Sequence, residues 1–475
     1  MDTLTPELID TITAFCSTAQ TKARWGSVNR HYYEATRRRL FQNVTITSPR
    51  QYLAFLRHLD EFEAKGYLER YVRTLDLSSY TVRGSGWSEQ QAKKVIVASD
   101  LAQWITRCRF LQQIVIGDEL MHVFVEPDVM RAIFTTDHPF LQVIDFTGFC
   151  DQKVTKAMAD LFLQQHSTTT NKDEDKAASP LLLPALYPPQ ESSDDDLMEV
   201  HHWKMPPRLT QLSFHLCMAL SPTLFFQPFF ERLASNGNTI TRLDLAHTPI
   251  TNQVFTHVNP STLTHLNLQG CRGIHCCDGL APFLRQCTNL VELNLNMHFN
   301  GVAVGNQFCS GCLGDFLRHD LKHMRRLRVL DLGGQAHLTD GLLIQTPRQV
   351  LAGLHYLSVA YATHVTLDGA MGTLLGGMKQ IEYLNVTRTS MNRNPRALLD
   401  LCARVAPQLE VIEVEDKAIG RDVVARSTTW AFSQHGRRGY YARQGVDPRF
   451  KYSQKLLLLD EQPQSPMMKY WSFSY

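Results

Sequence analysis

Three related hexads lie at the centre of the sequence: Ile240-Thr-Arg-Leu243-Asp-Leu245, Leu263-Thr-His-Leu266-Asn-Leu268 and Leu290-Val-Glu-Leu293-Asn-Leu295. Each hexad has aliphatic residues at positions one, four and six, with polar residues at positions three and five. In an extended strand, positions four and six point to one side and positions three and five to the other. The pattern therefore predicts short strands with one apolar, core-facing side.

The same spacing continues outward from the centre in both directions. The aliphatic hexads start at Val72, Leu111, Leu141, Leu209, Ile240, Leu263, Leu290, Leu327, Leu354, Ile381 and Leu409. Successive starts are 23–39 residues apart, except for one interval of 68. This spacing is close to the 20–29 residues of leucine-rich repeats. Phe41, Val44 and Ile46 repeat it once more and suggest an earlier first strand.

Amphipathic segments such as 279–284 and 342–351 lie between the hexads and predict helices. Parallel strands joined by such crossovers predict an α/β leucine-rich-repeat solenoid, a horseshoe with strands on its concave face and helices on its convex face. One repeat cannot bury its own apolar side, so neighbouring repeats must stabilise each other.

Cysteines occupy fixed positions around several hexads. Cys108 and Cys287 lie three residues before a hexad, and Cys217 and Cys271 lie three residues after one. These units resemble the cysteine-containing leucine-rich repeat. We expect small side chains at these positions to be buried in the turns, either packed or hydrogen-bonded.

The composition of the 475 residues is balanced. Lys and Arg number 48, Asp and Glu number 46, and 44% of residues are hydrophobic. The balance excludes a strongly basic nucleic-acid coat and an acidic disordered chain. No apolar run reaches about 18 residues and no basic leader opens the chain, so neither a membrane span nor a signal peptide is expected. Eleven cysteines without a leader predict reduced thiols, in the cytosol or the nucleus.

The first forty residues have helical rather than repeat periodicity. Leu8, Ile12 and Phe15 recur at the spacing of one helix face. Thr5 suits an N-cap, and Pro6 suits the first helical position. Apolar and aromatic residues from Trp25 to Phe41 predict one or two further short helices.

This segment resembles an F-box, the module that docks on the Skp adaptor of cullin–RING ubiquitin ligases. The opening L-P-x-E-L pattern is matched by Leu4, Glu7 and Leu8, with the proline shifted to Pro6 and Thr5 in its usual place. The later blocks are matched by 28–33 and 40–44. The resemblance implies adaptor contacts at Leu4, Pro6, Leu8, Ile9, Ile12, Val28, Arg30 and Tyr33.

An F-box followed by leucine-rich repeats resembles a known architecture, particularly its fungal versions. In that family the repeats hold a protein substrate, and the transfer of ubiquitin belongs to other subunits assembled on the cullin scaffold. The resemblance therefore implies a substrate receptor without catalytic residues. Two alternatives remain open: a ligase-independent scaffold whose N-terminal helices only cap the first repeat, and a nucleic-acid-associated protein that uses a basic tail.

We divide the chain into five parts. They are an F-box-like helical domain (1–45), a first repeat block (46–166), an acidic loop rich in Pro and Ser (167–207), a second repeat block (208–425) and a basic-aromatic cap or tail (426–475). The loop composition is typical of disorder. Basic and aromatic residues together can bind single strands. A cap over the last repeat is favoured instead, since no nucleic-acid-binding motif accompanies the charge.

No catalytic motif was found: the sequence has no P-loop, no H-E-x-x-H and no G-x-S-x-G. We therefore expect no enzyme activity and no cofactor. Cys309-Ser-Gly-Cys312 has the spacing of a metal-binding pair, and His275-Cys276-Cys277 precedes it. The adjacent cysteines of the second group suit tetrahedral geometry poorly, so the prediction is no metal.

The concave face is the default binding surface of a curved solenoid. Its candidate substrate-binding residues are the non-core strand positions, with Tyr356 and Tyr383 as an aromatic anchor. The full set is Arg242, Asp244, His265, Asn267, Glu292, Asn294, Asp331, Tyr356, Ser358, Tyr383, Asn385, Glu413 and Glu415. The competing interpretation is that such Asp and Asn residues only satisfy the backbone or solvent.

Overall fold

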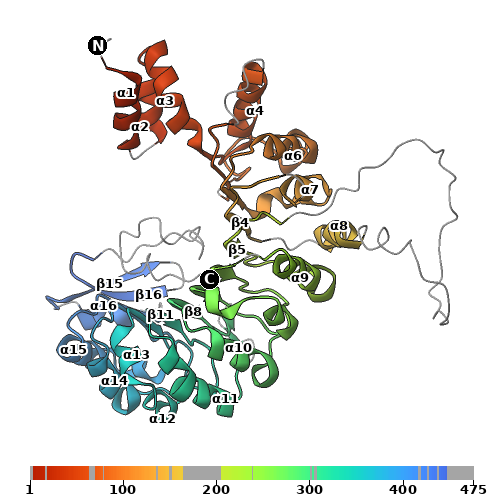
Figure 1. Cartoon of the computed structure of the whole chain (residues 1–475). Coiled ribbons are helices and arrows are strands. Elements are labelled where there is room, and N and C mark those ends of the chain that lie inside the picture. The colour runs from red at the N-terminus through yellow and green to blue at the C-terminus, as the bar shows by residue number, and fades with distance from the viewer. Residues whose placement is uncertain are drawn as a thin grey trace, which may run out of the picture.

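The computed structural model describes residues 4–16, 19–63, 70–78, 80–134, 137–148, 152–163, 205–237, 239–299, 302–303, 307–415, 419–424, 427–435 and 438–446. Among them, twelve parallel strands and a terminal antiparallel pair form one open, curved sheet. Figure 1 shows helices along the outer side of this sheet and a group of three helices at its N-terminal end. The chain is thus an α/β repeat solenoid.

The parallel strands follow each other in sequence order. They are β1 (Asn43–Thr45), β2 (Thr74–Leu77), β3 (Gln113–Ile116), β4 (Val143–Phe146), β5 (Gln211–Ser213), β6 (Arg242–Asp244), β7 (His265–Asn267), β8 (Glu292–Asn294), β11 (Val329–Asp331), β12 (Tyr356–Ser358), β13 (Tyr383–Asn385) and β14 (Val411–Glu415). A separate small hairpin, β9 (His298–Phe299) with β10 (Val302–Ala303), lies between β8 and β11.

All eleven predicted hexads contain a strand, and their three core positions are buried. The fourth position of each hexad lies in register with its neighbours, so that Leu243 is paired with Leu266 and Leu266 with Leu293. The row of aliphatic side chains crosses every repeat and forms the solenoid core. The further strand suggested by Val44 and Ile46 is β1, and both side chains are buried.

The turns after the strands use a recurring hydrogen bond to the preceding repeat. The Cys217 thiol donates to the Phe146 carbonyl at 2.8 Å, and the Cys271 thiol donates to the Leu245 carbonyl at 3.0 Å. In later repeats, the side-chain amides of Gln307 and Gln335 serve the same purpose. The expected burial of the repeat cysteines is therefore confirmed, with a hydrogen bond at the two positions after the strand.

Helices cover the other side of the sheet. They are α4 (Pro49–Glu63), α5 (Glu89–Val95), α6 (Ala98–Arg107), α7 (Asp128–Phe134), α8 (Gln152–Leu163), α9 (Gln227–Ser235), α10 (Ala281–Gln286), α11 (Ser310–Asp315), α12 (Asp340–Leu343), α13 (Arg348–Gly353), α14 (Gly372–Gly377), α15 (Pro395–Val405) and α16 (Ile419–Val424). Short 3-10 or π-helical turns complete the repeats at Asp118–Phe124, Pro222–Phe226, Asn252–Thr256, Pro260–Thr262, Cys276–Leu280, Phe316–Asp320, Leu321–His323, Leu367–Met371 and Ser390–Arg393.

The single helix expected over 342–351 is two short helices, since Pro347 is the N-cap of the second.

The 68-residue interval does not interrupt the sheet. Strands β4 and β5 on its two sides pair directly, with Val143 opposite Gln211. Phenylalanine rings join the same two repeats: Phe146 lies 5.7 Å from Phe214, and Phe134 lies 5.7 Å from Phe229. Aromatic pairs at these separations stabilise beyond their buried area. Residues 164–204, which hold nearly all of the predicted acidic loop, lie outside the described residues.

The C-terminal end of the sheet is closed by an antiparallel hairpin. Strand β16 (Arg438–Arg443) pairs with β14, and β15 (Trp430–His435) pairs with β16. Trp430 and Tyr441 are buried in the solenoid core, and the Arg443 guanidinium lies over the Trp430 ring at 5.0 Å. The described part of the predicted C-terminal segment therefore caps the last repeat.

None of the helices in the described ranges has the length and apolar character needed to cross a bilayer.

Candidate docking surfaces

The N-terminal unit consists of α1 (Pro6–Ala14), α2 (Ala19–Gly26) and α3 (Arg30–Gln42). Thr5 is the N-cap of α1, where its hydroxyl accepts the Leu8 N–H at 3.5 Å, and Pro6 is the first helical residue. Asn29 caps α3 by accepting the Tyr32 N–H at 2.9 Å. The predicted N-cap at Thr5 and the predicted N-terminal helices are confirmed.

Polar and aromatic contacts hold the three helices together. The Arg39 guanidinium donates two hydrogen bonds of 2.9 Å to the Asp10 carboxylate, which joins α3 to α1 in a bidentate pair. The Trp25 and Tyr32 rings stack at 5.6 Å between α2 and α3. Helix α3 ends at Gln42, directly before β1, so this three-helix unit is joined to the sheet without a linker.

Three large apolar side chains of this unit are exposed, among polar ones. Ile9 and Thr13 are the buried residues of α1, whereas Leu8 is 50% exposed and Phe15 is 85% exposed. Leu8 and Phe15 are seven residues apart, so they lie two turns apart on the same side of α1. Val28 is 51% exposed at the turn before α3. Of eight markedly exposed large hydrophobic residues in the described chain, three belong to this short unit.

The residues implied to contact an adaptor are mostly accessible. Pro6, Leu8, Val28 and Arg30 are exposed, and Leu4, Ile12 and Tyr33 are half-buried. Ile9 differs, because it is fully buried inside the unit and supports α1 from within. Phe15 is not among the adaptor contacts that the resemblance implies. Its place seven residues after Leu8 was the signal that could have placed it among them.

The concave-face candidates are largely inaccessible, contrary to the expectation of an open binding row. His265 and Glu415 are half-exposed. The others are buried: Arg242, Asp244, Asn267, Glu292, Asn294, Asp331, Tyr356, Ser358, Tyr383, Asn385 and Glu413. As the structure stands, these side chains belong to the interior.

Several of these residues have a repeated structural task. The Asp or Asn at the end of a strand accepts the backbone N–H two residues later, which fixes the turn that leaves the sheet. The bonds run from Ala246 to Asp244 at 3.0 Å, from Gln269 to Asn267 at 3.1 Å, from Asn296 to Asn294 at 3.0 Å, from Gly333 to Asp331 at 2.8 Å and from Thr387 to Asn385 at 3.0 Å. Such Asx turns compete with further strand structure. The interpretation that these residues satisfy the backbone is thus confirmed for this subset.

Charged and aromatic side chains fill the same inner side. Burial raises the pKa of the Glu292 carboxyl to about 8, although nearby Arg242 opposes the rise. Burial also raises the pKa of Glu413, despite an Arg438 guanidinium at 3.3 Å. The rings of Tyr356 and Tyr383 stack at 4.9 Å, as neighbours on adjacent strands should. They form a buried cluster with Tyr440 rather than an exposed anchor.

Three of the four described aromatic residues of the C-terminal segment lie in the interior, and the fourth, Phe432, is partly buried against the core. Trp430, Tyr440 and Tyr441 are at most 3% exposed, so their ring faces are closed to nucleobases. Base stacking on aromatic rings is what a basic-aromatic site for single strands requires. Phe450 and Tyr452 lie outside the described residues. The described part of the segment supports the role of a cap.

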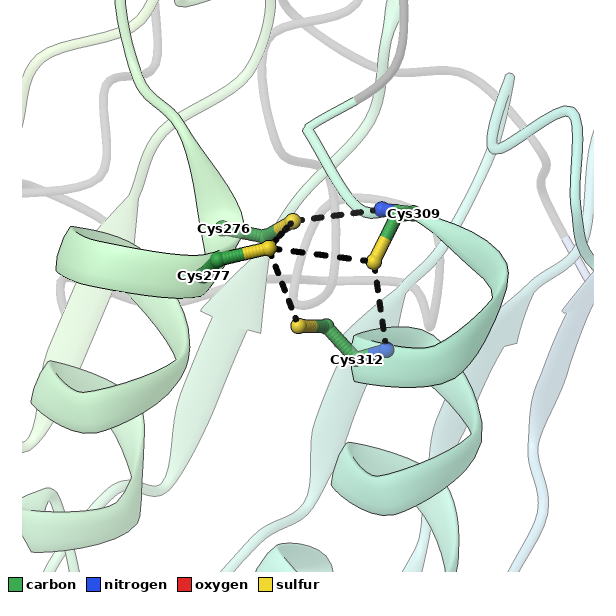
Figure 2. A group of neighbouring side chains, drawn as sticks. All are labelled: Cys276, Cys277, Cys309 and Cys312. Atoms are coloured by element: carbon green, nitrogen blue, oxygen red, sulfur yellow. Dashed lines mark hydrogen bonds between the residues drawn. The ribbon is translucent and has the colours of Figure 1, made fainter.

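A group of four cysteines was excluded as a metal site on the basis of the sequence. The structure brings Cys276, Cys277, Cys309 and Cys312 together, with all four Sγ atoms within 4.8 Å of one another (Figure 2). The Cys312 backbone N–H, which donates to Cys309 Sγ, is the main cause that lowers the pKa of the Cys309 thiol to about 7. The adjacent pair, which was expected to suit tetrahedral geometry poorly, therefore lies in one group with the C-x-x-C pair.

Comparisons with known proteins give distant likenesses. No protein-family model and no curated protein sequence matches the chain. It is similar to a chain in the crystal structure of the Rad7 and Elc1 complex in yeast, at 13% identity over 88% of this chain and 91% of that chain, with a TM-score of 0.44. It is also similar to the leucine-rich repeat-containing protein LegL7 from Legionella pneumophila, at 13% identity over 79% of this chain and 91% of that chain, with a TM-score of 0.30.

Proposed function

We propose that the chain is a non-catalytic substrate receptor of a cullin–RING ubiquitin ligase. The three-helix unit would bind a Skp-type adaptor, and the repeats would bind a protein substrate through surfaces other than the buried concave row. The contribution of such a receptor is proximity, since it holds a substrate beside the enzyme that carries ubiquitin. The proposed compartment is the cytosol or the nucleus, which is where a chain with many cysteines and no leader is expected to act.

One observation carries the proposal: two large apolar residues of this unit, Leu8 in α1 and Phe15 at its C-cap, are exposed. Ile9 and Thr13 pack inside the unit, which leaves Leu8 and Phe15 available for another protein. Contiguous exposed apolar residues on a folded domain mark interaction sites. Leu8 is among the adaptor contacts that the resemblance to an F-box implies, and an F-box binds its adaptor through this segment.

The alternative is a ligase-independent scaffold. The observation that favours it is the direct continuation of α3 into β1, because a helical unit joined in this way can serve only to cover the first repeat. A cap has no need of Leu8 and Phe15 on its outer side. Adaptor binding therefore separates the two functions.

The test is co-purification of the full chain with a Skp-type adaptor, comparing two double variants. Leu8→Asp with Phe15→Asp places charge on the proposed surface, and Asp is compatible with the first turn of α1, where Leu8 lies. Burying each apolar side chain is worth about 1.5–3 kcal/mol, so binding should weaken about 100-fold or more. The control is Leu224→Asp with Ile344→Asp, two residues of the repeats that are 51% and 53% exposed.

The wild type and the control should retain the adaptor in stoichiometric amounts, and the α1 variant should lose it. Circular dichroism should show all three proteins folded. If the folded wild type retains no adaptor, the scaffold is the better account. If the α1 variant binds as well as the control, the adaptor uses another surface and the proposed site is wrong.

A further inference from the structure

We propose that Cys276, Cys277, Cys309 and Cys312 form a structural zinc site that joins two consecutive repeats. The distances carry the proposal. In a tetrahedral site with Zn–S bonds of about 2.3 Å, the sulfur atoms lie about 3.8 Å apart. The Sγ of Cys277 lies 3.6 Å from that of Cys276, 4.0 Å from that of Cys309 and 3.7 Å from that of Cys312. These three of the six sulfur–sulfur edges therefore agree with a tetrahedron around a single ion, and the remaining ones are no longer than 4.8 Å.

The four ligands come from two helix starts in neighbouring repeats, as Figure 2 shows. Cys276 and Cys277 open the π-helical turn that leads into α10. Cys309 is the N-cap of α11, and Cys312 lies in that helix. The two adjacent cysteines of this turn have their sulfur atoms 3.6 Å apart, so both can reach the same point.

Backbone groups support the sulfur atoms. The Cys309 N–H donates to Cys276 Sγ at 3.2 Å, and the Cys312 N–H donates to Cys309 Sγ at 3.4 Å. Thiolates are the form that binds metal, and N–H donors directed at sulfur stabilise that charge. Such secondary contacts also fix the orientation of the ligands before the ion binds.

The position of the four cysteines in the fold indicates what a bound ion would stabilise. The repeat from Leu290 to Leu327 spans 37 residues, whereas the next two intervals span 27. Its additional residues lie in the region of the β9–β10 hairpin, and the chain returns to the repeat pattern at Gln307, which donates to the Leu268 carbonyl at 2.7 Å. Cys309 follows immediately. An ion held here would fasten the end of this insertion to the preceding repeat.

The ligand set also indicates the class of ion. Four thiolates with no open position describe a structural rather than a catalytic site. Soft thiolates in a tetrahedron select zinc or iron–sulfur chemistry. Iron–sulfur clusters contain several iron atoms and sulfides and hold their cysteines farther apart than the distances found here. These distances leave room for one ion only.

The experiment measures metal in the full-length chain, purified under reducing conditions from zinc-supplemented cells. Elemental analysis should find one zinc ion per chain, as expected of a four-thiolate structural site. The double variant Cys277→Ser with Cys312→Ser should lose it. The matched control is Cys16→Ser, because Cys16 is a free, partly exposed cysteine outside the group. That control should keep its zinc.

A cobalt titration of the metal-free wild type makes the test independent of the variants. One equivalent of cobalt should produce the visible absorption of a tetrahedral cobalt–thiolate centre, and zinc should abolish that absorption. Wild-type protein that holds no zinc and gives no cobalt spectrum overturns the proposal. So does a double variant that retains full zinc, or mass spectrometry that finds disulfides among the four cysteines in protein purified without oxidant.

Discussion

The carboxylate of Glu292 shows what happens to a polar residue on the inner side of this sheet. Its neighbours on the adjacent strands are His265 and Val329, and only 4% of the residue is exposed. Burial disfavours the charged form, which is why the pKa of this carboxyl rises to about 8. A buried carboxyl of this kind affects the stability of the fold and is not accessible to a binding partner.

The pH dependence of stability follows from Glu292. Between about pH 4.5 and pH 8 the unfolded carboxyl is ionised while the folded one keeps its proton, so the folded state binds more protons. A rise in pH across this window therefore lowers the free energy of unfolding, by at most about 1.4 kcal/mol per pH unit. Urea unfolding of wild type and Glu292→Gln at several pH values measures this contribution.

The Gln variant should show a smaller loss of stability across the window, because it cannot ionise. Glu126→Gln, at an exposed position, serves as the control and should keep the wild-type dependence. Equal pH slopes in wild type and Glu292→Gln would contradict the assigned burial of the carboxyl.

At the scale of elements, the strands could be predicted and the sites could not. A hexad reveals its strand because all three core positions lie within six residues, and the same hexad recurs in each repeat. The concave row was predicted to be a binding surface because strand alternation identifies the residues that point away from the core. Alternation does not show whether other side chains cover those residues. Asp244 and Asn267 instead form turns by accepting the backbone N–H two residues later. This role can be recognised only when the backbone conformation after the strand is known.

The cysteine group was found in the sequence but rejected as a metal site, because adjacent cysteines suit tetrahedral geometry poorly. Cys276 and Cys309 are 33 residues apart, and only the fold shows that they lie at two helix starts close in space. Spacing rules for metal ligands assume that both pairs have the same local geometry. Here one pair is an ordinary C-x-x-C at a helix start, and the other lies in a π-helical turn.

The turns between elements give a second prediction, at two glycines with a left-handed backbone. Gly334 has φ of 69° and Gly237 has φ of 70°. A Cβ on Gly334 would meet the Met297 carbonyl carbon at 2.8 Å and the His298 nitrogen at 2.9 Å, whereas a Cβ on Gly237 would meet nothing within 4 Å. Both Gly→Ala changes incur backbone strain of about 1–2 kcal/mol.

Gly334→Ala should lose about a further 1–3 kcal/mol, because main-chain atoms of the preceding repeat cannot move aside. Chemical denaturation of the two variants gives the difference directly. Equal stabilities would mean that the backbones of these two repeats are not as close as the structure has them.

At the scale of the whole molecule, the chain has two closed regions and one open one. The C-terminal hairpin closes the sheet edge, with Trp430 and Tyr441 in the core. The inner side of the sheet is filled by its own polar and aromatic residues. The three-helix unit stands at the N-terminal end of the sheet (Figure 1). It differs from the other two regions because its Leu8, Phe15 and Val28 are exposed. Among the described residues of these three regions, the proposed adaptor surface is therefore the one with exposed large apolar side chains that a partner could bury.

Hydrogen–deuterium exchange of the full chain, with and without a Skp-type adaptor, tests this claim most directly. The account predicts slower exchange on adaptor binding in residues 4–16 and 28–33, and unchanged exchange in the repeat strands. Protection of the repeats with none in the N-terminal unit, or no protection anywhere at saturating adaptor, would contradict it.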